Sequence, residues 1–265
     1  SATRLTRRVD TLRGPRHRGA RVMAEATIQF TLNGAPRSVT VDSRATLLEV
    51  LRDDCGVISP KDGCSPQGQC GCCTVLVDGQ AKVSCATAAT KCEGKSILTL
   101  EGVPAERVDL FGEAFARAGG LQCGFCIPGI VMRAHWLLGK NAKPTRAEIA
   151  RSLDVHLCRC TGYVKILDAI EMAAAALRGE PMPEADRSGK VGTRLPKYEA
   201  VELALGRRPY IDDMTVDGML HGAVAYSWVS HGRLRAVHVD EARAVPGVVL
   251  VATAADVPGR NEVGA

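Results

Sequence analysis

Residues 24–100 alternate between apolar and polar positions in short runs, which is the pattern of half-buried β-strands. The alternation is clearest at residues 27–32, and the Asn33-Gly34 pair that follows favours a two-residue hairpin turn. Thr46 and Glu49 form a capping box, which predicts one short helix among the strands. We expect strands at 27–32, around Val39 and Val41, and at 74–77, 81–84 and 96–100.

The periodicity then changes to that of amphipathic helices. Pro128 lies just inside one helix start, and Thr145 and Glu148 form a second capping box. Gly179 follows the last apolar turn and is typical of a helix end. Short links between the helices favour a compact bundle of four, at 105–118, 128–139, 145–154 and 163–178.

Residues 179–194 follow neither period and are rich in glycine, proline and charge, which is typical of a linker. Strand-like runs return after residue 195, without a closing element before Ala265, so we expect a truncated third region. The predicted strands of that region are 222–229, 234–239 and 248–252. The pattern therefore predicts an α+β protein with a basic extension at 1–22 and segments at 23–101, 102–178, 179–194 and 195–265.

The net charge of +5 is concentrated in residues 1–22, which hold seven arginines and one acidic residue. The remainder carries a net charge of −1 and offers no basic patch for nucleic acid. The extension itself is either a targeting peptide or an unstructured segment. No apolar run approaches the length of a membrane span.

The chain contains eleven cysteines, in patterns that favour metal ligation over disulfides and indicate a cytoplasmic protein. The first set has the spacing C-x5-C-x2-C-x11-C, close to the plant-type [2Fe–2S] pattern. We interpret Cys72, which lies inside this pattern, as a small side chain beside the cluster. The predicted ligands of the first set are Cys64, Cys70, Cys73 and Cys85.

The second set has the spacing C-x2-C-x31-C-x-C, and each of its pairs precedes a predicted helix whose N-terminus favours thiolates. Two sets of four thiolates predict two [2Fe–2S] clusters. A zinc site with four cysteines is the alternative for either set, although both spacings fit zinc poorly. The predicted ligands of the second set are Cys123, Cys126, Cys158 and Cys160.

The cysteine loops contain Cys-Gly-x-Cys-Thr-Val at 70–75, Gln-Cys-Gly-Phe-Cys-x-Pro-Gly-Ile at 122–130 and Leu-Cys-Arg-Cys-Thr-Gly-Tyr at 157–163. In combination these motifs closely resemble the molybdenum hydroxylases, the family of xanthine dehydrogenases and aldehyde oxidoreductases. The resemblance covers about 25–178 and implies a ferredoxin-like β-grasp domain followed by a four-helix domain. The chain departs from the family by one extra residue between its first two ligands.

A second match resembles the start of the same family's molybdenum-binding region, its α/β-hammerhead domain. It covers residues 191–200, 210–214, 218–223, 244–248 and 254–259. The resemblance implies that a molybdopterin, or molybdopterin cytosine dinucleotide, centre hydroxylates an aldehyde or heterocycle. It also implies that Gln122 and Cys160 lie against the pterin. Electrons would then enter at the second cluster and leave through the first. The catalytic molybdenum-site residues are expected beyond residue 265, so we assign none in this chain.

The resemblance implies an oxidoreductase of which this chain is the electron-transfer portion. The expected partners are a molybdenum-binding region or subunit and a separate FAD subunit or soluble electron carrier, in an oligomer. A stand-alone ferredoxin-type carrier is one alternative, against which Gln122 and the match at 195–265 count. A zinc-bound structural module is another, and iron analysis distinguishes it.

Overall fold

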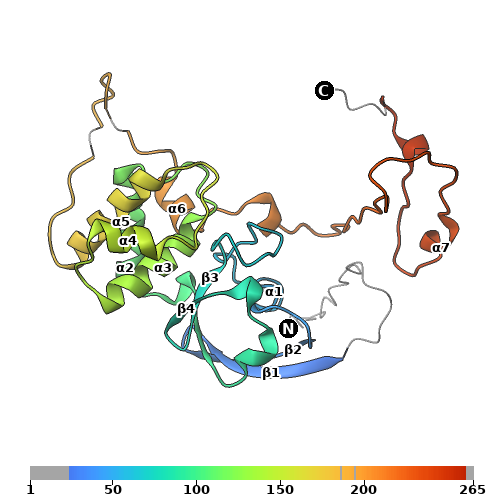
Figure 1. Ribbon diagram of the computed structural model, residues 1–265, viewed down its shortest axis with the longest axis horizontal. Coiled ribbons are helices and arrows are strands. Elements are labelled where there is room, and N and C mark those ends of the chain that lie inside the picture. Colours follow the sequence, from blue (N-terminus) through green and yellow to red (C-terminus); the bar gives the residue numbers. More distant parts are fainter. Residues whose placement is uncertain (1–23, 186, 194, 261–265) are drawn as a thin grey trace, which may run out of the picture. The chain divides into compact units, whose positions relative to one another are not determined.

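The computed structural model describes residues 24–185, 187–193 and 195–260 (Figure 1). The extension predicted for residues 1–22 lies outside this range. The described chain divides after Met219 into two compact units, which we treat separately. Among the described residues, every helix is too short or too polar to span a bilayer.

A five-stranded sheet forms the N-terminal part of the larger unit, in the order β2-β1-β5-β3-β4. β1 and β5 run parallel, whereas the other neighbouring pairs are antiparallel. The β1–β2 turn places Asn33 and Gly34 at positive φ, as its sequence predicts. The strands are β1 (Glu25–Leu32), β2 (Ala35–Asp42), β3 (Thr74–Val77), β4 (Gln80–Val83) and β5 (Ser96–Leu98).

The predicted hairpins and short helix are confirmed, with small differences at their ends. Thr46 caps helix α1 (Leu47–Glu49) through the predicted capping box, and the chain continues as a π-helical turn over Val50–Asp54. Ser84 and Leu100 begin 3₁₀ turns instead of ending strands. Alternate residues of β1 are buried against this helix and the sheet: Ile28, Phe30 and Leu32.

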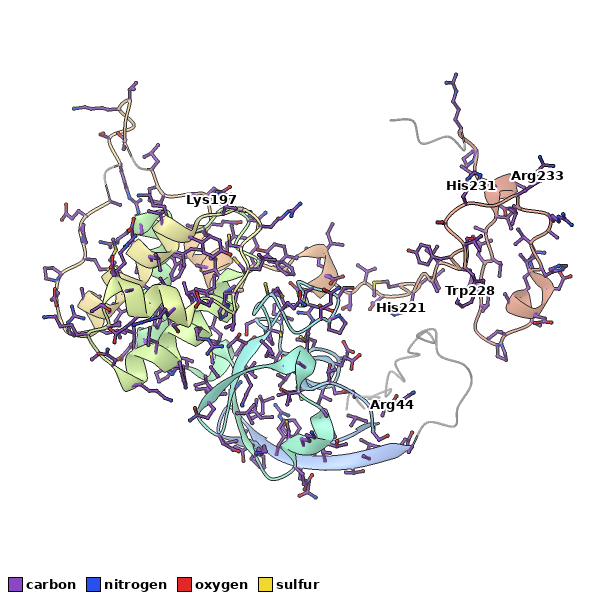
Figure 2. The ribbon with its side chains drawn as sticks, in the orientation of Figure 1. Arg44, Lys197, His221, Trp228, His231 and Arg233 are labelled. Atoms are coloured by element: carbon purple, nitrogen blue, oxygen red, sulfur yellow. The ribbon has the colours of Figure 1, made fainter. Side chains whose placement is uncertain are left out.

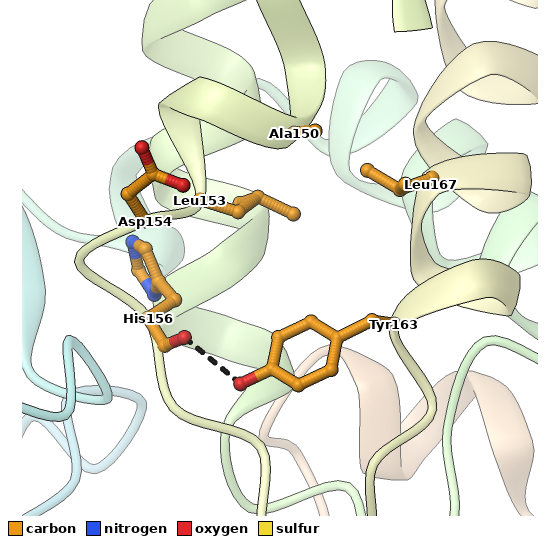
Figure 3. A pocket seen from close by; sticks show the side chains of 6 residues that line it. All are labelled: Ala150, Leu153, Asp154, His156, Tyr163 and Leu167. Atoms are coloured by element: carbon orange, nitrogen blue, oxygen red, sulfur yellow. Dashed lines mark hydrogen bonds between the residues drawn. The ribbon is translucent and has the colours of Figure 1, made fainter. Parts of the chain in front are cut away.

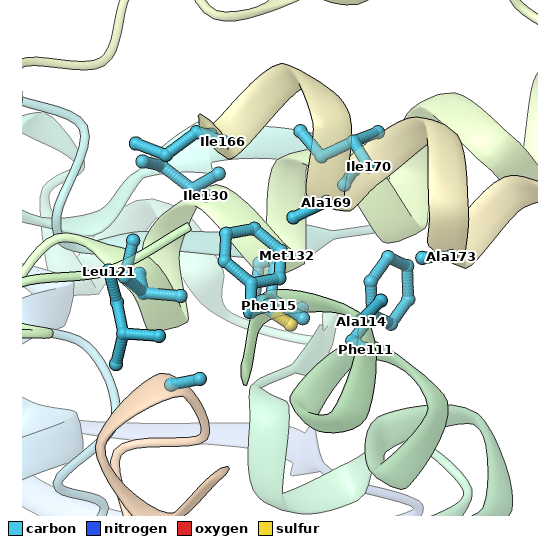
Figure 4. Packing of buried hydrophobic residues seen from close by; sticks show 14 of the residues in the cluster. Phe111, Ala114, Phe115, Leu121, Ile130, Met132, Ile166, Ala169, Ile170 and Ala173 are labelled. Atoms are coloured by element: carbon cyan, nitrogen blue, oxygen red, sulfur yellow. The ribbon is translucent and has the colours of Figure 1, made fainter. Parts of the chain in front are cut away.

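Four helices form the second part of the larger unit, as the periodicity predicts. Helices α2 and α5 pack against each other through aromatic, aliphatic and small side chains. Figure 4 shows Phe111 and Phe115 of α2 facing Ile166 and Ile170 of α5. The helices are α2 (Ala105–Ala118), α3 (Ile127–Lys140), α4 (Arg146–Ser152) and α5 (Tyr163–Leu177).

Helix α3 joins the helical part to the sheet by packing against β3. The contact depends on Gly129, because a Cβ atom there would lie 2.5 Å from the carbonyl oxygen of Gly71 and 2.8 Å from that of Cys72. The loop that carries the first cysteine set is therefore in backbone contact with the helix that follows Cys123 and Cys126 of the second set.

The predicted linker contains neither helix nor strand in its described residues. Helix α6 (Ala200–Ala204) follows it and packs on α2, where Val201 lies over Gly112. The three strands predicted after residue 220 are wrong. The described residues there form helix α7 (Asp240–Arg243) and a 3₁₀ turn (Ala254–Asp256), but no strand.

The physical reason is that a strand needs a hydrogen-bonded neighbour, and the described residues 220–260 provide none for these runs. Their apolar side chains are accordingly exposed, including a completely exposed Trp228. Figure 2 shows Trp228, His221 and His231 projecting from this irregular segment.

Candidate metal centres

The first cysteine set lies on the loop before β3 and on the 3₁₀ turn after β4 (Ser84–Ala86). Three of its thiols are buried, and that of Cys64 is half-buried. Backbone N–H groups point at sulfur in this loop: Gln67 N lies 3.3 Å from Cys64 Sγ, and Cys85 N lies 3.5 Å from Cys73 Sγ. Amides directed at thiolate sulfur are what an iron–sulfur cluster requires of its loop.

The loop also adjusts the acidity of its thiols. Burial tends to raise the pKa of Cys64, but the amides of Gln67, Gln69 and Cys70 outweigh burial and lower this pKa to about 7. Burial, followed by the nearby thiol of Cys73, raises the pKa of Cys85 to about 12. The positive charge of iron ions bound here would offset the cost of deprotonating thiols that crowd one another.

Gly63 leaves room for the sulfur atoms in the first loop. A Cβ atom at this position would lie 2.9 Å from Cys72 Sγ and 3.0 Å from Cys70 Sγ. The space beside these two sulfurs is therefore open only because residue 63 has no side chain.

Cys72 lies between the two cysteine sets. Its side chain is 3% exposed, and its thiol donates to the Cys70 carbonyl over 3.8 Å. Burial raises its pKa, and the thiols of Cys70 and then Cys126 raise it further. Cys72 is therefore a neutral buried thiol, consistent with its interpretation as a small side chain beside the cluster.

The second cysteine set lies at two helix starts, as predicted. Cys126 is the N-cap of α3, and Cys158 and Cys160 lie in the loop before α5. Cys160 Sγ is 3.5 Å from Cys123 Sγ. Burial raises the pKa of Cys126, and the neighbouring thiol of Cys158 raises it further, whereas the Cys123 amide lowers the pKa of Cys160.

Three side chains fix the loops around the second set. Gln122 Nε2 donates to the Cys160 carbonyl over 2.9 Å. The Cys158 amide donates to Tyr163 Oη over 2.8 Å, and the Tyr210 hydroxyl donates to the Cys123 carbonyl over 2.6 Å. The sequence analysis singled out Gln122 for the pterin and gave the hydroxyl groups of Tyr163 and Tyr210 no role.

A backbone hydrogen bond joins the two sets. Leu157 N donates to the Cys70 carbonyl over 2.9 Å, and Leu157 directly precedes Cys158. His156 lies beside this bond, and a Cβ atom on Gly71 would be 2.6 Å from its Nδ1 atom. Burial and Arg133 lower the pKa of His156 to about 3, so it is a neutral spacer between the loops.

A hollow of about 280 Å³ lies beside His156 and is mainly apolar. Figure 3 shows the Tyr163 hydroxyl bonded to the His156 carbonyl at one side of it. In the described part of the chain no three His, Cys, Asp or Glu side chains are arranged to hold a single metal ion. The lining residues are Ala150, Leu153, Asp154, His156, Tyr163 and Leu167.

A β-sheet with a cysteine loop, joined to a helical bundle with four further cysteines, defines a two-cluster iron–sulfur protein. Family models agree along the chain. The 2Fe-2S iron-sulfur cluster binding domain matches residues 30–98, and the [2Fe-2S] binding domain matches 99–171. The a/b hammerhead domain of aldehyde oxidase and xanthine dehydrogenase matches 205–265.

Individual relatives give the same result. The aldehyde oxidoreductase of Megalodesulfovibrio gigas is 37% identical over 88% of this chain and 27% of its own length. The nicotinate dehydrogenase small FeS subunit of Eubacterium barkeri is 42% identical over 57% of this chain and 96% of its own length. The crystal structure of the aldehyde oxidoreductase from Desulfovibrio desulfuricans matches with a TM-score of 0.80 and 34% identity, over 89% of this chain and 27% of that chain.

The chain belongs to the molybdenum hydroxylase family of xanthine dehydrogenases and aldehyde oxidoreductases. It is the iron–sulfur part of such an enzyme, which serves in electron transfer, followed by hammerhead sequence. It spans about a quarter of the length of the aldehyde oxidoreductases that it matches.

Proposed function

We propose that the two cysteine sets hold one [2Fe–2S] cluster each and form a conductor between a molybdenum–pterin centre and an electron acceptor. The observation that carries this proposal is the Leu157–Cys70 hydrogen bond, which brings the backbones of the two sets together. When bound, each cluster supplies one-electron transfer. The proposed ligands are Cys64, Cys70, Cys73 and Cys85 for the first cluster, and Cys123, Cys126, Cys158 and Cys160 for the second.

The protein's own residues hold and shield the clusters. The loop amides stabilise thiolate at Cys64, and burial of Cys70, Cys73 and Cys85 excludes water from the first set. Tyr163 fixes the Cys158 loop at its amide, while Gln122 fixes the same loop at the Cys160 carbonyl. These two side chains therefore hold in place the backbone that carries Cys158 and Cys160.

We assign the entry of electrons to the second set. Cys123 is exposed, and the apolar side chains of Leu157 and Val164 beside the Cys158–Cys160 loop are 58% and 66% exposed. Exposed apolar side chains next to a cluster loop are typical of a surface on which another protein or domain binds. Together with the family resemblance, this supports Gln122 and Cys160 as the residues that face the pterin.

We assign the exit of electrons to the first set, because its loop is exposed at residues 65–67. The partners that we propose are a molybdenum-binding region or subunit, and a FAD subunit or soluble electron carrier at the exit, in an oligomer in the cytoplasm. Purification of the full-length protein, followed by cofactor analysis and sizing, tests these assignments. A monomer that contains iron but neither molybdenum nor any flavin partner would overturn them.

Electron paramagnetic resonance of the reduced protein tests the clusters. We expect two distinct [2Fe–2S] signals, of which Cys158→Ser removes one and leaves the other. Cys72→Ala is the matched control, since it removes a buried cysteine from the same region, and it should keep both signals. A colourless zinc protein, or loss of a signal on Cys72→Ala, would refute the ligand assignment.

A further inference from the structure

A buried ion pair connects the segment after the linker to the first cysteine loop. The Asp213 carboxylate accepts from Lys61 Nζ over 2.5 Å and from Arg52 Nη2 over 2.7 Å. The side chains of Asp213 and Lys61 are each 1% exposed. Lys61 lies three residues before Cys64, and its backbone N–H donates to the Cys72 carbonyl over 3.1 Å.

The same segment reaches the second set through Tyr210. The Asp213 carboxylate also accepts from the Tyr210 amide over 2.9 Å, while the Tyr210 hydroxyl bonds the Cys123 carbonyl. The Tyr210 ring lies edge-on to Phe125 at 5.2 Å, and Lys61 Nζ is 5.1 Å from its centroid. Burial, and then Cys123 and Cys126, raise the pKa of Tyr210 to about 12, which is consistent with thiols close to the phenol.

These contacts place a charged cluster against Tyr210, whose hydroxyl bonds the Cys123 carbonyl of the second set. Lys61 and Arg52 bring two positive charges and Asp213 one negative charge, while the neighbouring Glu101 carboxylate is bonded to Ser59. A buried ion pair contributes little net stability compared with apolar side chains of similar volume. Its consequence here is electrostatic, because charges in a shielded interior act on any neighbouring redox group.

We propose that residues 210–213 form a latch through which the region after the linker sets the reduction potential of the second cluster and positions its Cys123 loop. The proposal rests on the function proposed above, since it requires a cluster at Cys123. Lys61 favours the reduced, more negative cluster, whereas Asp213 opposes it. A bound latch therefore lowers the potential relative to a released latch, because release removes the negative charge of Asp213 from this cluster.

Two single variants and their combination test the latch. The measurement is a redox titration of the electron paramagnetic resonance signal of the second cluster, which is the signal that Cys158→Ser abolishes. Lys61→Met should lower the midpoint potential because it removes a positive charge, and Asp213→Asn should raise it because it removes a negative charge. The double variant restores the original net charge and should lie near the wild type. A unit charge about 10 Å away, at an effective dielectric constant of about 20, changes the reduced-to-oxidised ratio about tenfold, which for one electron is about 59 mV.

The exposed pair Lys95 and Asp78 provides the matched control, since its atoms lie 2.9 Å apart on the sheet surface. Lys95→Met and Asp78→Asn should leave both potentials unchanged. Shifts of the same sign in Lys61→Met and Asp213→Asn, or no shift, would overturn the latch. Absence of the second signal in the wild type would instead overturn the proposed function.

Tyr210→Phe keeps the ring and all charges, and so tests positioning if the charge variants do not fold. It removes the hydrogen bond to the Cys123 carbonyl and should change the line shape of the second signal alone, because that bond positions the loop that carries Cys123. An unchanged potential and line shape in this variant would contradict the positioning role of Tyr210.

Discussion

Gly129→Ala tests the backbone contact between the two cysteine regions. Gly129 lies in α3, where alanine is intrinsically favoured over glycine by up to about 1 kcal/mol. Sterics oppose this gain, because the new Cβ atom would lie 2.5 Å from the Gly71 oxygen, 2.8 Å from the Cys72 oxygen and 2.9 Å from the Cys72 carbonyl carbon. All three atoms belong to the backbone and cannot rotate away.

Overpacking of this kind typically costs about 1–3 kcal/mol, which exceeds the helical gain in most of its range. We therefore expect Gly129→Ala to destabilise the protein by about 1–2 kcal/mol. For a chain of this size each kcal/mol lowers the melting temperature by about 2–4 °C. The assay is thermal unfolding followed by circular dichroism, with the electron paramagnetic resonance spectrum recorded on the same samples.

Gly139→Ala is the matched control in the same helix. Gly139 is exposed, and no atom lies within 4 Å of its missing Cβ atom. This substitution should leave stability unchanged or raise it by up to about 1 kcal/mol. If Gly129→Ala were as well tolerated as Gly139→Ala, the close approach of α3 to the first cysteine loop would be refuted.

Two further predictions concern a hydrogen bond and a pH dependence. Tyr163→Phe leaves the Cys158 amide without its acceptor and should cost about 1–3 kcal/mol in urea unfolding, with a changed spectrum for the second cluster only; an unchanged free energy would contradict it. Burial, and then Arg107, lower the pKa of His135 to about 4, so the unfolded chain takes up its proton first as the pH falls. The free energy of unfolding should fall by about 2 kcal/mol between pH 6.5 and 5, and His135→Gln should reduce this fall. Urea unfolding at several pH values measures it, and the same pH dependence in the wild type and in His135→Gln would exclude the effect.

Local signals account for what the sequence predicted correctly. Asn33-Gly34 defines its hairpin because few other residues accept positive φ at both turn positions. The capping boxes at Thr46 and Thr145 define helix starts through bonds within four residues. The cysteine spacings are equally local, and they led to both predicted ligand sets, which stay predictions until the clusters are measured.

Contacts between distant residues account for what was missed. Tyr210 meets the Cys123 carbonyl across 87 positions, and Asp213 meets Lys61 across 152. No spacing rule connects such pairs, so the resemblance at residues 210–214 did not predict these contacts. The strands predicted after residue 220 failed for a related reason, since the pattern shows which side chains could alternate but not whether a partner strand lies beside them.

The contact between the two cysteine regions consists of backbone atoms. Whether it tolerates a substitution therefore depends on whether the new side chain pushes these backbones apart. The Cys70 carbonyl accepts from Leu157, and the Gly71 carbonyl lies against Gly129. Side chains at these two glycines would separate the loops, whereas the Cys72 thiol only fills space beside them. The five residues between Cys64 and Cys70 are exposed or half-buried, and none of them supplies an atom to this contact. The loop can therefore be lengthened there without moving the atoms that join the two sets.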